Sequence, residues 1–163
     1  MTHLSRSSRF RKALLVVLAF ALAGIAVGHT QRNRSGNGAD EEPAFREYKG
    51  VQLGWLADDV RKKLGSPADK GDEQDFFVFG EKETAQILYD KATHKVTAIS
   101  VDFMNGATDV ITPQQVFGAD IEAKPDGSKY KMVRYPKVGY WISYSKTGGA
   151  SPIVTVTIQK MQP

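Results

Sequence analysis

Apolar residues change their spacing several times along this chain, and each spacing predicts a different kind of element. From 13 to 27 they form one unbroken run. Further along they recur at Leu56, Val60 and Leu64, a spacing that places three side chains on one face of an α-helix. Gly65 follows directly and favours the end of that helix. The pattern therefore predicts a short amphipathic helix after a separate apolar segment.

Alternating β-branched and aromatic residues then predict strands at 76–79, 85–89 and 97–103, and Asn105-Gly106 closes this group with a turn. The same order recurs in the second half. Thr112 with Pro113 and Gln115 has the form of a helix N-cap with a capping box, and the helix is expected to end by Gly118. Three more strands are predicted at 130–135, 140–144 and 153–160.

The two groups predict an α+β domain built from two degenerate repeats, about 50–106 and 107–161. Each unit would hold a short helix followed by three antiparallel strands. Neither is large enough to be stable alone, so the units are expected to share one core. We expect one mostly antiparallel sheet with the helices on one face.

The start of the chain has the form of a targeting signal. Four basic residues precede the run from 13 to 27, which at fifteen residues is short for a membrane span of about 20. We interpret 1–28 as a signal peptide or a signal anchor. Because 29–44 contains no large apolar side chain, it is predicted to be a flexible tether, and 45–163 to be the folded domain.

Charge is divided unevenly between these parts. The protein has 163 residues and a net charge of +4, but six of its 22 basic residues and none of its 18 acidic ones precede Asp40. The remainder carries a net charge of −2, which argues against a nucleic-acid partner for the domain. The charge bias places everything after the apolar run outside the cytoplasm, periplasmic or secreted, with 13–28 as an inner-membrane anchor if it is not cleaved.

The sequence offers little for catalysis or metal binding. The absence of cysteine excludes disulfides and thiolate chemistry. His94 is the single histidine of the predicted domain, in a polar turn. The acidic cluster of Asp69, Asp72, Glu73 and Asp75 lacks the spacing of a calcium loop and is expected to be a solvated loop. We therefore expect no cofactor, no metal and no enzymatic activity.

One stretch favours a binding surface. Basic residues alternate with aromatic ones between 129 and 141, and aromatic residues with arginine dominate the energetics of protein interfaces. Trp141 and Arg134 are the predicted anchors, with Tyr135 beside them. Trp55, directly before the first helix, is a further candidate.

The stretch from Gly50-Val51-Gln52-Leu53-Gly54 to Leu64-Gly65-Ser66-Pro67 resembles the opening of the SmpA/OmlA (BamE-like) domain. The tandem arrangement resembles the beta-lactamase inhibitor protein fold. This resemblance implies a bacterial envelope protein that binds another protein through its sheet or loops. The chain lacks the lipidated cysteine of the assembly lipoproteins and the disulfides of the inhibitors.

Together these features predict a non-enzymatic envelope protein that acts by protein–protein binding. The alternative is a secreted inhibitor of an extracellular enzyme, which the tandem resemblance implies.

Cleavage of the targeting segment separates these two outcomes in part. For a secreted inhibitor, we expect mass spectrometry of the protein from the medium to give an N-terminus near Gly24 or His29. Retention of Met1 in the membrane fraction would instead identify an anchor.

Overall fold

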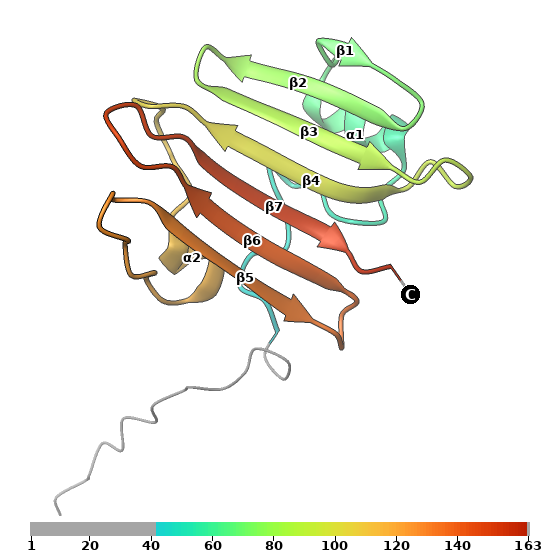
Figure 1. The fold of residues 1–163 in the computed structure, drawn as a ribbon. Coiled ribbons are helices and arrows are strands. Elements are labelled where there is room, and N and C mark those ends of the chain that lie inside the picture. Colours follow the sequence, from blue (N-terminus) through green and yellow to red (C-terminus); the bar gives the residue numbers. More distant parts are fainter. Residues whose placement is uncertain (1–41, 163) are drawn as a thin grey trace, which may run out of the picture. The chain divides into compact units, whose positions relative to one another are not determined.

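A computed structural model describes residues 42–162, so the predicted targeting segment and most of the predicted tether lie outside the described residues. Within this part, seven strands form one antiparallel sheet and two short helices accompany it (Figure 1). The elements in chain order are α1 (Ala57–Leu64), β1 (Asp69–Lys70), β2 (Gln74–Gly80), β3 (Glu83–Tyr89), β4 (Val96–Phe103), α2 (Pro113–Phe117), β5 (Lys129–Tyr135), β6 (Tyr140–Lys146) and β7 (Val154–Lys160). Over the residues described, no helix has the length and apolarity needed to cross a membrane.

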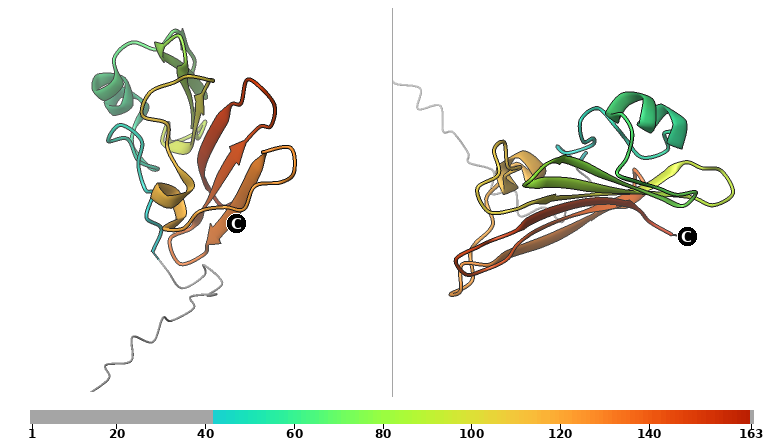
Figure 2. Two further views of the ribbon diagram at one scale, coloured as in Figure 1. Left: turned by 90° about the vertical axis from the view of Figure 1, so that its left-hand side faces the viewer. Right: turned by 90° about the horizontal axis from the view of Figure 1, so that it is seen from above.

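The strands do not follow their sequence order across the sheet. The spatial order is β1-β2-β3-β4-β7-β6-β5, so the last strand of each half, β4 and β7, pair at the centre. Both helices lie on the same side of the sheet, as the view from above in Figure 2 shows. The antiparallel sheet with helices on one face is thus confirmed.

Most of the local elements agree with the sequence. The six predicted strands are present: five are longer than predicted by one to three residues, and β7 begins one residue later. In α2, the side chain of Thr112 accepts from the N–H of Gln115, whose own side chain accepts from Thr112, so the predicted capping box is formed. Helix α1 begins after Leu56 without a side-chain cap. The two-residue strand β1 was not predicted.

The core lies between the sheet and the helices. It is built from the alternate strand residues that face this side, together with Val60 of α1, Val116 of α2 and Val51 of the preceding loop, all of them fully buried. Each buried valine removes its side chain from water at a gain of about 1.5–3 kcal/mol. The helices are too short to be stable alone, so this packing holds them.

One acidic residue overturns an expectation from the sequence. Asp75 was expected in a solvated loop, but it lies in β2 with 0% of its surface exposed. Its carboxylate accepts from Arg61 of α1 through Nε at 2.8 Å and Nη2 at 3.1 Å. The hydroxyl of Tyr89 donates to it at 2.8 Å, and the N–H of Gly71 at 3.3 Å. A buried carboxylate is tolerated because all these donors satisfy it.

The same contacts shift the titration of the partners. The hydrogen bond to Asp75 raises the pKa of Arg61 above its ordinary value and outweighs the opposing effect of burial. Burial, and then the hydrogen bond to Asp75, raises the pKa of Tyr89 far above its usual range. Tyr89 thus stays a neutral donor and Arg61 a cation.

A second cluster fastens the entering chain to the start of β3. The hydroxyl of Tyr48 donates to Glu83, and Lys49 Nζ lies 3.0 Å from the same carboxylate. The ammonium of Lys49 also lies 4.8 Å from the ring centre of Phe79, a cation–π distance. Burial opposes the charge of Glu83, but the hydrogen bonds from Tyr48 and Lys49 prevail and hold its pKa below the ordinary value.

We expect Asp75→Asn to destabilise the domain by about 3 kcal/mol, because it leaves the half-buried guanidinium of Arg61 without its carboxylate. Urea unfolding followed by circular dichroism measures this loss. The matched control is Asp58→Asn, which removes the exposed carboxylate 3.3 Å from the same guanidinium and should cost less than about 0.5 kcal/mol. Equal midpoints for the two variants would contradict this account.

Glu83 gives the domain an acid-sensitive contribution. Because its pKa is lowered by folding, this contribution is complete at neutral pH and is lost as the pH falls below about 4.5. We expect Glu83→Gln to be about 1 kcal/mol less stable than the unmodified protein at pH 7, and this gap to close between pH 5 and pH 3. Urea unfolding across that range measures the gap, with the exposed neighbour Glu81→Gln as control. A gap that does not change with pH argues against the assignment.

Candidate protein-binding face

The side of the sheet away from the helices forms one continuous surface, which we call the open face. It is made of three rows of residues that lie opposite one another across six strands, from β2 to β5. The rows are Gln74, Leu88, Ala98, Gln159, Trp141 and Arg134; Phe76, Gln86, Ser100, Thr157, Ser143 and Met132; and Val78, Thr84, Asp102, Thr155, Ser145 and Tyr130. In Figure 1 this face is toward the viewer and both helices lie behind it.

Small hydroxylated side chains occupy the middle of the open face. The hydroxyls of Ser100 and Thr157 lie 3.0 Å apart across β4 and β7. Thr155 donates to Asp102, so the carboxylate on this face is already engaged. These cross-strand contacts keep the centre low and rigid, because short β-branched side chains hold few rotamers.

Larger side chains stand at the two ends of the rows. At the β2 end are Phe76, Leu88 and Val78, the last with 53% of its surface exposed. At the other end, Tyr130 is 58% and Met132 43% exposed. We call Tyr130, Met132, Arg134 and Trp141 the β5–β6 patch. Exposed large apolar side chains gathered in one place are typical of an interaction site.

The mixed basic and aromatic stretch is divided by the strand alternation. Residues 130, 132 and 134 face the open side, whereas Lys129 and Lys131 face the helices. There Lys129 Nζ pairs with Asp120 at 2.8 Å, and Lys131 Nζ lies 4.9 Å from the ring centre of Phe117 in α2. The lysines of β5 therefore contact α2 and the loop that follows it, and Arg134 is the cation that the strand adds to the open face.

The four residues predicted as a binding site separate into three places. Trp141 and Arg134 lie directly opposite each other in β6 and β5, on the open face. Tyr135 faces the core with 6% exposure, and its ring centre is 6.1 Å from that of Tyr140. Trp55 lies on the helix side of the sheet. The structure thus brings two of the four together.

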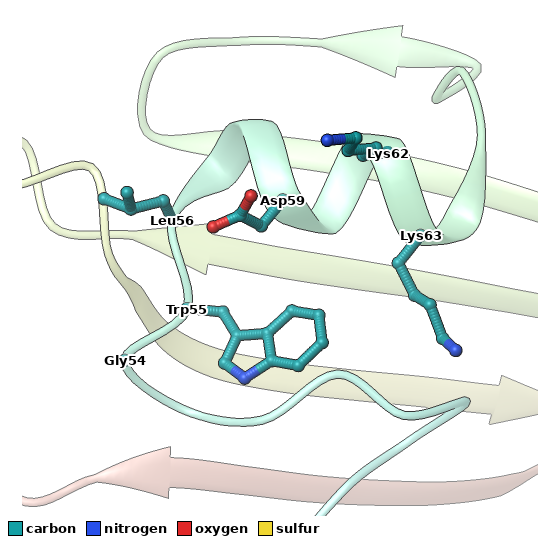
Figure 3. A pocket seen from close by; sticks show the side chains of 6 residues that line it. All are labelled: Gly54, Trp55, Leu56, Asp59, Lys62 and Lys63. Atoms are coloured by element: carbon teal, nitrogen blue, oxygen red, sulfur yellow. The ribbon is translucent and has the colours of Figure 1, made fainter.

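Trp55 borders a depression of about 550 Å³ beside α1, shown in Figure 3. Its half-buried indole faces the helix, and the other lining side chains are Leu56, Asp59, Lys62 and Lys63. The backbone of Trp55 is tied to the sheet, because its carbonyl accepts from the N–H of Val96 at 2.8 Å. This arrangement gives Trp55 a packing role at the entry to α1, separate from the open face.

Sequence reasoning missed Tyr130 and Met132 as members of the site. The signal was present, since both share the alternation parity of Arg134. It could not be used without the strand pairing, because parity alone does not tell which side of β5 the helices cover.

Chemistry at the other candidate positions is limited. No group of three or more acidic, histidine or cysteine side chains among residues 42–162 is placed to hold a metal ion. His94 is exposed in the turn between β3 and β4, with a positive φ of 53°. The Gly148–Ser151 segment is part of the connection between β6 and β7.

We compared the chain with protein-family models, with curated proteins and with solved structures, and none of the three comparisons found a match.

Proposed function

We propose that this protein is a non-enzymatic, extracytoplasmic protein of the bacterial envelope that binds another protein through the open face of its sheet. The observation that carries the proposal is the β5–β6 patch, where Tyr130 and Met132 are about half exposed beside Trp141 and Arg134. Tryptophan, tyrosine and arginine are the residues that most often anchor protein interfaces.

The size and rigidity of the open face support this proposal. Six strands about 4.8 Å apart make a face about 24 Å wide, the scale of an interface that buries about 800 Å² on each partner. Its strands are held by the packed core on the other side, so binding costs little ordering of the backbone. The hydroxyl-rich centre can form hydrogen bonds with a partner, and the patch supplies apolar contact.

The extracytoplasmic placement and the SmpA/OmlA-like character of the proposal rest on the sequence features of 1–28 and 50–67. No cofactor is part of the proposal, and nucleic acid is not its partner. If the targeting segment is not cleaved, the membrane is a second contact through 13–28.

The topology supports a finer proposal, that the domain arose from two copies of one unit. Helix α1 precedes the meander β2-β3-β4, α2 precedes β5-β6-β7, and the two third strands pair. This arrangement favours the alternative function, a secreted inhibitor that presents the same face to an extracellular enzyme. The two functions differ in whether the partner is an envelope component or a soluble enzyme.

We expect a photo-crosslinking amino acid at Ser143, in the centre of the open face, to give a discrete adduct with a partner in intact producing cells. The same group at Lys62, exposed on α1, is the matched control and should give no such adduct. Trp141→Ala in the Ser143 background should reduce the adduct at least tenfold, since a central aromatic anchor contributes 2 kcal/mol or more.

Adducts from Lys62 alone, or an adduct at Ser143 that Trp141→Ala leaves unchanged, would argue against the open face. Unfolding midpoints of all variants show whether a loss comes from the surface or from the fold. Mass spectrometry of the adduct identifies an envelope protein or a soluble enzyme and so decides between the two functions.

A further inference from the structure

The two edges of the sheet are constructed differently. At one edge, the two-residue strand β1 covers part of β2, Ala68 donates to the carbonyl of Phe76 at 2.8 Å, and a bulge interrupts β2 between Val78 and Gly80. Short strands and bulges of this kind block the addition of further strands. At the other edge, β5 is seven residues long, pairs with β6 without a register shift and contains no proline. Within residues 42–162, only the β5 edge keeps a regular row of backbone groups that no other strand covers.

The turn after β5 fixes which backbone groups point outward. The carbonyl of Tyr135 accepts from the N–H groups of Val138 and Gly139, so the backbone N–H and C=O groups of Tyr135 point toward β6. Because the direction of the backbone groups alternates along a strand, the N–H and C=O groups of Val133 and Lys131 also point toward β6. The N–H and C=O groups of Tyr130, Met132 and Arg134 therefore point away from the sheet. These are the three residues whose side chains β5 adds to the open face.

The charged residues of the β5–β6 hairpin itself are all of one sign. The segment 129–146 contains five basic residues, Lys129, Lys131, Arg134, Lys137 and Lys146, and no acidic one, although the domain as a whole, 45–163, is almost balanced, with 16 basic and 15 acidic residues. Among the described residues, Arg134 and Lys146 have no acidic partner. A second copy of this chain would bring two such segments together, which like-charge repulsion opposes.

We propose that the β5 edge binds an extended, acidic segment of the partner protein as an additional antiparallel or parallel strand. The inference rests on the proposed function and names the chemistry of its partner. Main-chain hydrogen bonds to Tyr130, Met132 and Arg134 supply affinity, as in other cases of strand addition. Acidic side chains of the added strand meet Arg134 on the open face. Because side chains alternate along a strand, its apolar side chains lie on the helix side, beside Val133.

A pair of substitutions at one position isolates the backbone contribution. Met132→Pro removes an outward N–H that the sheet itself does not use, so the domain should fold normally. Met132→Ala removes the same side chain and keeps the N–H. The probe is a fluorescent peptide of alternating valine and glutamate, seven residues long, and its control replaces each glutamate with glutamine. Fluorescence anisotropy with the purified domain measures both.

We expect the glutamate peptide to bind at least tenfold more tightly than the glutamine peptide at low salt, and this preference to decline as salt screens the charges. Met132→Pro should abolish binding, whereas Met132→Ala should weaken it less than fivefold. Arg134→Glu should remove the preference for glutamate. Equal binding by the proline and alanine variants, or no binding of the glutamate peptide, overturns strand addition.

Two further outcomes are distinguishable. If the Ser143 adduct survives Met132→Pro but not Trp141→Ala, the open face binds its partner without strand addition, so this inference fails and the proposed function stands. If sedimentation shows a dimer that Met132→Pro dissociates, the occupant of the edge is a second copy, and the acidic partner is overturned.

Discussion

The contact on which this domain most depends is the buried pair of Asp75 and Arg61. It joins α1 to β2 through two hydrogen bonds, and Tyr89 completes it from β3. A carboxylate with no exposed surface cannot be left unpaired, so α1 can pack only where its arginine reaches β2. This requirement places an eight-residue helix that lacks a side-chain N-cap and has few buried residues of its own.

Placing both helices on one side of the sheet decides the character of the other. In the central strands β4 and β7 the large apolar side chains face the helices, and the alternation leaves serine, threonine and glutamine in the middle of the open face. A sheet with one side packed and one side solvated is the usual form of an antiparallel sheet. What is unusual in this one is the concentration of large exposed side chains at the β5 end, which is why the proposed function begins there.

Strand β5 shows how one strand serves two purposes. Its lysines turn toward the helix side, where Lys131 contacts Phe117 of α2 and Lys129 pairs with Asp120 in the loop after it, while Tyr130, Met132 and Arg134 turn outward. The mixed basic and aromatic composition that suggested a single surface is therefore the sum of two surfaces. Interpreting the composition without the alternation would assign the lysines to a partner that they do not face.

The sequence alone determined the local elements, because caps, alternation and turn residues act over a few positions: the Thr112 capping box and six strands could be found without the fold. Only the tertiary structure decided that Asp75 is buried, that Tyr135 is in the core while Tyr130 is exposed, and that β4 pairs with β7. These outcomes depend on which strands become neighbours and which side the helices cover, and both are set by contacts between residues far apart in the chain.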